Sequence, residues 1–93
     1  MAYSTDNPPA LVSQGVAGFG KTWAYDSADA ATVVRVDGYI TNAEELGMAV
    51  GDRVEQFDSA GGTVSHVYNV VAINANGSAD LSDGTAIAST DTD

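Results

Sequence analysis

The sequence contains no cysteine and only one histidine. Disulfide bonds, thiolate metal sites and cysteine nucleophiles are therefore excluded. His66 alone cannot form a zinc site of several histidines. It does not activate its neighbour Ser65 either, because adjacent strand residues point to opposite faces. We expect His66 to be a strand residue with a hydrogen-bonded ring, and we expect no catalytic residue, no metal site and no cofactor.

Basic residues are also scarce. Three of them, Lys21, Arg35 and Arg53, stand against thirteen acidic residues and give a formal net charge of −10. This charge repels DNA, RNA and anionic membranes. No apolar run approaches the roughly 20 residues that span a bilayer, and residues 1–9 lack the basic and apolar regions of a secretory signal. We therefore expect neither nucleic acid nor membrane as a partner.

A chain of 93 residues fits one domain with a small core, because a chain of this size buries only about two-thirds of its unfolded surface. We expect residues 1–20 to form an extended arm, residues 21–90 a β-rich domain and residues 91–93 a loose tail. Pro8 and Pro9 favour the polyproline II conformation, and the glycines that follow permit unusual dihedral angles. The arm should gain order by lying against another surface, so a chain that lacks residues 1–14 is expected to fold.

Residues 37–54 combine several local signals. Thr41 and Glu44 have the spacing of a capping box, in which each side chain satisfies a backbone N–H at a helix start. Residues 43–46 are good helix formers, and Gly47 stands where a left-handed residue ends a helix, with Met48 folding back onto it. The pattern predicts one short helix near residues 42–46.

The rest of the chain has β-rich runs separated by turn residues. A glycine-containing loop at residues 59–62 and an Asn-Gly turn at residues 76–77 indicate hairpins. For residues 28–31 a helical turn remains an alternative to a loop. Recurring turns with short strands between them are typical of a small sandwich or barrel, so we predict a mostly β fold. Strands are expected at residues 21–25, 32–36, 53–58, 63–73, 78–81 and 85–89.

The strand expected at residues 63–73 is partly apolar on both faces. A half-exposed strand alternates between apolar and polar residues, so this one should lie centrally in the fold or hold one face against a neighbouring subunit.

Residues 15–22 (GVAGFGKT) match the P-loop pattern, in which backbone N–H groups, a lysine and a hydroxyl hold a nucleotide and magnesium. That pattern needs a buried strand before it and a sustained helix after it. Residues 22–27 are expected to be extended instead. A nucleotide hydrolase that uses Lys21 and Thr22 is therefore a minor alternative to a flexible glycine loop.

Two further patterns concern binding. Residues 74–80 contain Asn and Asp, but they fall short of the alternating oxygen ligands of a calcium loop. Trp23, Tyr25, Tyr39 and Tyr68 can form either a sugar-stacking platform or the core. The core is favoured for Trp23 because the chain has few other large apolar side chains.

Three stretches resemble a known group of proteins: residues 7–15 (NPPALVSQG), 37–52 (DGYITNAEELGMAVGD) and 79–84 (ADLSDG). They are similar to small acidic head-decoration, or cement, proteins of tailed phages that infect marine alphaproteobacteria. The resemblance covers most of the chain, through turn and cap signatures. It implies a non-enzymatic structural virion protein, made in the host cytoplasm, that binds the outer surface of an icosahedral capsid and stabilises it.

The expected partners are the major capsid protein and sister copies, as a homo-oligomer on the capsid lattice. An exposed capsid strand can pair with the arm by β-augmentation. Alternatives are a glycan- or receptor-binding module and another virion component of the tail or connector. The partner-binding residues expected from the sequence are Pro8, Pro9, Leu11, Val12, Trp23 and Tyr68.

Overall fold

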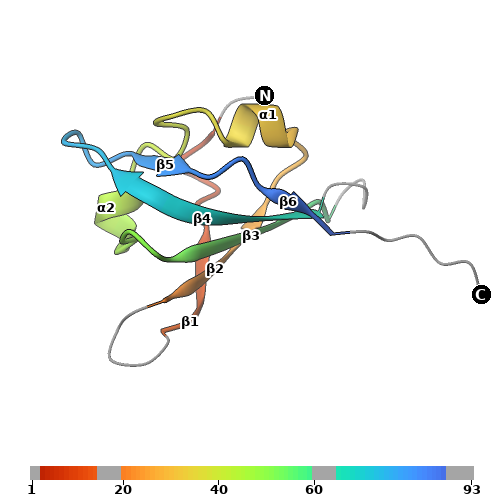
Figure 1. Cartoon of the computed structure of the whole chain (residues 1–93), viewed down its shortest axis with the longest axis horizontal. Coiled ribbons are helices and arrows are strands. Elements are labelled where there is room, and N and C mark those ends of the chain that lie inside the picture. The colour runs from red at the N-terminus through yellow and green to blue at the C-terminus, as the bar shows by residue number, and fades with distance from the viewer. Residues whose placement is uncertain (1–2, 15–19, 60–64, 88–93) are drawn as a thin grey trace, which may run out of the picture.

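The computed structural model describes residues 3–14, 20–59 and 65–87. Within these ranges it contains six strands, which form one mixed sheet, and two short helices (Figure 1). The prediction of a mostly β domain with a short helix near residues 42–46 is confirmed. The elements are β1 (Ala10–Ser13), β2 (Thr22–Asp26), α1 (Ala31–Val34), α2 (Ala43–Leu46), β3 (Arg53–Phe57), β4 (Ser65–Ile73), β5 (Ala79–Leu81) and β6 (Thr85–Ala86).

The strand order is β1-β2-β3-β4-β5, with β6 beside β4. In Figure 1, β3 runs along one side of β4, while β5 and β6 run along the other. The central position predicted for residues 63–73 is therefore confirmed for β4, which covers residues 65–73. β2 and β3 are parallel, and the other pairs are antiparallel. A parallel pair needs a long crossover connection, and residues 27–52, which contain both helices, provide it.

The strand predicted at residues 32–36 is wrong, because this segment forms α1. The Val34 N–H donates to the carbonyl of Ala30 at 3.1 Å, and the Arg35 N–H donates to that of Ala31 at 2.9 Å. Val34 is buried whereas Val33 and Val36 are exposed. The β preference of these valines is overridden because a single turn of helix buries one of them against the sheet.

α2 ends as predicted but does not begin as predicted. Gly47 has a φ of 100°, and the Met48 N–H donates to the Ala43 carbonyl at 3.0 Å, which is a Schellman motif. The predicted capping box is wrong, since Asn42 is the N-cap and makes no side-chain cap bond. The Glu44 N–H donates instead to the carbonyl of Gly77 at 2.9 Å. A carbonyl group of a distant turn therefore accepts a hydrogen bond from a backbone N–H at the start of α2.

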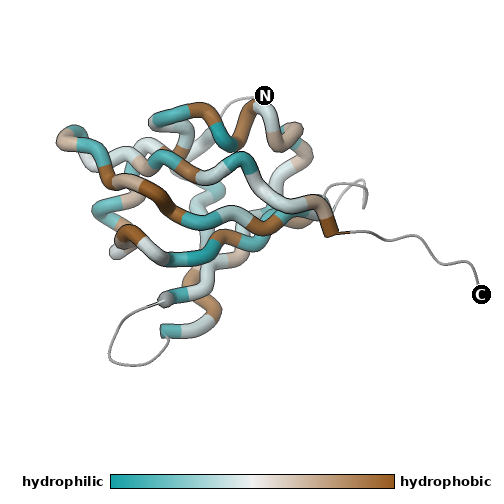
Figure 2. Tube along the Cα trace, viewed as in Figure 1, coloured by the Kyte–Doolittle hydropathy of each residue, from teal (hydrophilic) through white to brown (hydrophobic). Residues whose placement is uncertain are grey.

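Hydrophobic and hydrophilic residues alternate along much of the chain (Figure 2). The core forms where the apolar residues of the strands meet those of the helices and of the crossover. Among the described residues, its buried members are Trp23, Tyr25, Val34, Ile40, Ala43, Met48, Val54, Tyr68, Val70, Ala79 and Leu81.

Gly84 packs closely against the buried ring of Tyr68. A Cβ atom at Gly84 would lie 2.6 Å from Cε2 of that ring, and the φ of Gly84 is +87°. The Tyr68 hydroxyl donates a hydrogen bond to Gln56 Oε1 at 2.5 Å, so the buried ring is held in place. Both the backbone conformation and the close approach therefore require glycine here.

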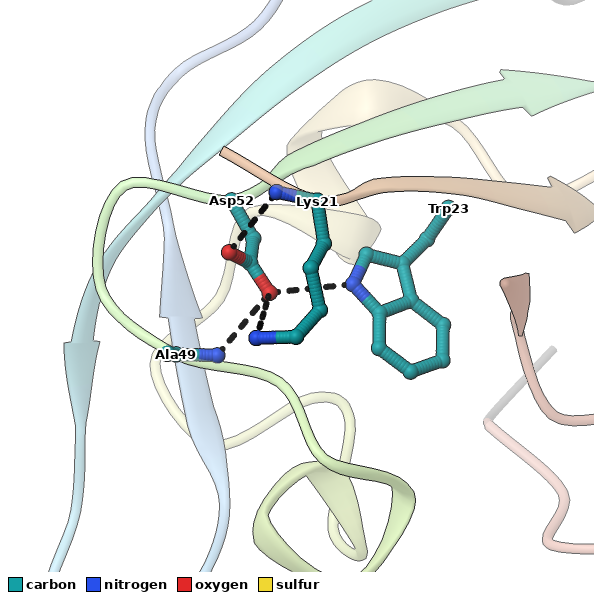
Figure 3. Close-up of polar contacts among 4 residues, drawn as sticks. All are labelled: Lys21, Trp23, Ala49 and Asp52. Atoms are coloured by element: carbon teal, nitrogen blue, oxygen red, sulfur yellow. Dashed lines mark hydrogen bonds and ion pairs between the residues drawn. The ribbon is translucent and has the colours of Figure 1, made fainter. Parts of the chain in front are cut away.

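A buried carboxylate holds β2 and β3 together where their parallel pairing begins (Figure 3). Asp52 accepts hydrogen bonds from the Lys21 N–H at 3.2 Å, the Trp23 Nε1–H at 3.1 Å and the Ala49 N–H at 3.0 Å. The Lys21 ammonium lies 3.9 Å from the same carboxylate. One side chain thus joins the start of β2, a core aromatic residue and the turn before β3.

Asp52→Asn should destabilise the protein by about 2–3 kcal/mol, because the new NH₂ group faces a buried donor and the ion pair is lost. Urea unfolding followed by the fluorescence of Trp23, the only tryptophan, measures the change. Asp6→Asn is the matched control, since Asp6 is exposed and should change stability by less than about 0.5 kcal/mol. Equal urea midpoints for the two variants would contradict this role for Asp52.

Candidate functional site

The sheet has one covered face and one open face. Side chains alternate along β3, so that Val54 and Gln56 are buried while Arg53, Glu55 and Phe57 are exposed. The buried side chains lie in the core, and the exposed ones stand on the opposite face. This second face is the open face.

The side chains of the neighbouring strands β2 and β4 are also divided between the two faces of the sheet. The register places Ala24 of β2 beside Glu55, and Glu55 beside Val67 of β4, so these residues form a row across the open face. The helices contribute Val34 and Ala43 to the core cluster. They therefore cover the other face of the sheet.

The open face carries a hollow of about 520 Å³. Its apolar side chains come from four strands or strand ends, and among the described residues that line it Glu55 is the one with a charged side chain. Phe57 is 44% exposed and Ile87 is 49% exposed, although both are large and apolar. The Ile87 N–H donates to the Ser65 carbonyl at 2.9 Å, which fixes Ile87 at the end of β6. Apolar residues at the hollow are Ala24, Phe57, Val67 and Ile87.

β1 is the outermost strand beside β2, and all four of its residues are exposed. Its register with β2 is interrupted between Leu11 and Ser13. Within the part of residues 1–20 that the structure describes, residues 10–13 thus pair with β2 as a strand of the sheet, and the extended arm expected for residues 1–20 stays a prediction. Residues 91–93, expected as a loose tail, lie outside the described residues.

The partner-binding residues expected from the sequence do not form one site. Pro8 is exposed and Pro9 is buried. Leu11 and Val12 are 42% and 63% exposed on the edge strand. Trp23 and Tyr68 are only 3% and 1% exposed, as core residues. Of these six residues, the structure places Leu11 and Val12 together on the surface, and it places the two aromatic residues inside.

Sequence reasoning missed Phe57 and Ile87. The alternation in residues 53–57 and the apolar character of both faces of residues 63–73 were visible signals. What the sequence does not show is that β6 returns beside β4, with Ala86 opposite His66. This pairing brings Ile87 to the same hollow as Phe57.

The N-terminal segment is attached to the core through tyrosines. The Tyr3 hydroxyl donates to Asn42 Oδ1 at 2.5 Å, and the Tyr3 ring lies 6.0 Å from that of Tyr25 and 5.6 Å from that of Tyr39. The Tyr39 hydroxyl donates to Asp29 Oδ2 at 2.5 Å. Tyr3 and β1 therefore contact the rest of the described chain, and the expected folding of a chain that lacks residues 1–14 stays a prediction.

Burial changes the acidity of these tyrosines. It raises the pKa of Tyr3 to about 12, and Tyr25 adds to the rise while the bond to Asn42 opposes it. Burial likewise raises the pKa of Tyr39; its hydrogen bonds with Asp29 and Tyr25 add to the rise, whereas the bond with Ser27 opposes it. On the open face, hydrogen bonds from the hydroxyl and N–H of Ser59 lower the pKa of Asp26. Asp26 therefore remains negative near Phe57, its register partner.

His66 lies in a strand, as predicted, but its ring is not fully hydrogen-bonded. Its Nδ1 is buried without a hydrogen-bond partner among the described residues. The ring stacks on Tyr68 with centroids 6.1 Å apart and an interplanar angle of 22°. The stacking contact with Tyr68 therefore helps to hold this side chain.

The structure bears on three minor alternatives from the sequence: a nucleotide site, a metal site and a sugar-stacking platform. Thr22 opens β2 where a P-loop needs a helix, and residues 15–19 of that pattern lie outside the described residues. Within the described ranges, no three acidic or histidine side chains gather closely enough to hold a metal ion. Trp23 and Tyr25 are buried, so they offer no stacking surface for a sugar.

In comparisons with known proteins, no family model, curated protein or solved structure matched this chain. Among the described residues, neither helix has the length and apolar character that crossing a bilayer requires.

We expect the free energy of unfolding to fall as the pH rises from about 10 towards 12. The pKa of Tyr68 is also raised to about 12, by burial, although Arg35 opposes the rise. A raised pKa in the folded state means that the unfolded chain loses its phenolic protons first, so stability is complete below pH 10 and declines above it. Urea midpoints measured across this range test the expectation, and Tyr3→Phe should make the decline shallower. A midpoint that does not change up to about pH 11.5 would contradict it.

Proposed function

We propose that this protein is a non-enzymatic decoration, or cement, protein that binds the outer surface of an icosahedral phage capsid and stabilises the shell. The observation that carries the proposal is the open face of the sheet. Large apolar side chains at Phe57, Val71 and Ile87 are about half exposed there or beside it. A face of this kind, on a chain of this size, is suited to another protein surface. The resemblance of residues 7–15, 37–52 and 79–84 to head-decoration proteins gives the class of that surface.

The charge of the chain supports a position outside the shell. A formal net charge of −10 repels packaged DNA. The same charge attracts a capsid surface that presents lysine and arginine, and it speeds the encounter with such a surface.

The edge strand supports a second contact. Among the described strands, β1 is the last on its side of the sheet, so a capsid strand can extend the sheet by backbone hydrogen bonds. Leu11 and Val12 are exposed beside that edge and can enter shallow pockets of the partner. Because each copy binds a repeated lattice, contacts between sister copies would strengthen the attachment without a large interface per copy.

The proposal is tested with capsids of the phage that encodes the protein, stripped of this protein. We expect purified protein to sediment with them, to saturate at a fixed ratio to the major capsid protein, and to raise the temperature at which the capsids break. An unrelated acidic protein of similar size serves as the control for charge alone. Absence of sedimentation, or equal sedimentation of the control, would refute the decoration function.

A further inference from the structure

The hollow on the open face is a concave surface formed by side chains of several strands. It measures about 520 Å³, which is within the range of about 300–1,000 Å³ typical of binding pockets. Phe57 and Ile87 stand on different strands and leave about half of their surface exposed. Buried apolar anchors in pockets carry most of the binding energy of protein interfaces. The hollow therefore has the size and lining for an apolar side chain of another protein.

We propose that the hollow receives an apolar side chain of the major capsid protein, on a segment that also presents a lysine or arginine to Glu55. This inference rests on the proposed function and names the contact that performs it. Within the described part of the chain, Glu55 is the only charged residue that lines the hollow, and it is exposed. A partner cation can therefore reach it without leaving an unpaired charge buried.

Charge favours a capsid segment over a second copy of this chain as the partner that occupies the hollow. Each copy carries a formal net charge of −10, and Asp26 adds a carboxylate on the same face as Glu55. Arg53 is the only basic residue of β3 and stands two residues before Glu55 on that face. Asp26 and Glu55 together outweigh Arg53, so two open faces placed together would bring an excess of negative charge face to face, which disfavours association. A basic segment with an apolar anchor fits both the lining and the charge.

The test compares four variants for sedimentation with stripped capsids. Phe57→Ser and Ile87→Ser remove the two sides of the hollow independently, and each should weaken binding about thirtyfold, as for residues that dominate an interface. Val36→Ser is the matched control, because Val36 is 56% exposed but lies after α1, outside the sheet, and it should bind like the unchanged protein. Glu55→Gln should weaken binding at low salt and reduce its dependence on salt.

Circular dichroism and urea unfolding show whether each variant is folded. Hydroxyl-radical footprinting of the unchanged protein gives a readout that does not depend on the variants. Phe57 and Ile87 should become protected on the capsid, whereas Val36 should not.

The outcomes separate this inference from the proposed function. Saturable binding of the unchanged protein, together with weaker binding of Phe57→Ser and Ile87→Ser and protection of Phe57, supports both the inference and the proposed function. If all variants bind equally and Phe57 is not protected, the hollow is not the binding site for the capsid side chain, but the decoration function remains supported. Self-association of the protein that Phe57→Ser abolishes identifies a second copy as the occupant and overturns the inference. No binding of the unchanged protein overturns both.

Discussion

The carboxylate of Asp52 is the contact on which the sheet depends. It accepts hydrogen bonds from Trp23 and from the backbone of Lys21 and Ala49, and it is buried beside the Lys21 ammonium. Parallel pairing of β2 and β3 begins next to these bonds. A buried carboxylate without such donors would oppose folding, whereas here each bond also fixes a strand end or a turn. The row that runs from Ala24 to Val67 across the open face follows from this alignment.

The same alignment gives the sheet two unequal faces. The crossover between β2 and β3 places both helices on one face. The open face keeps apolar side chains, among them Phe57 and Ile87, that stay about half exposed and that no described helix covers. Such a chain gains from a partner that supplies the missing layer. This asymmetry links the fold to the decoration function that we propose.

Local signals predicted part of this structure. Gly47, residues 76–77 and the alternation of residues 53–57 specify backbone conformations through their own chemistry, and the structure confirms the helix end, the turn and β3. Residues 32–36 were predicted wrongly because burial of Val34 in the core outweighs β propensity. The hollow could not be predicted, since it needs the return of β6 to β4. Pairing between segments far apart in sequence depends on the assembled fold and has no local signature.

The most direct test of the central claim is a reconstruction, by electron cryomicroscopy, of stripped capsids to which the purified protein has been added back. We expect density for one copy at each symmetry-related position, with the open face, Phe57 and Ile87 towards the shell and α1 and α2 towards solvent. Density in the opposite orientation, with the helices against the shell and the open face uncovered, would contradict the account.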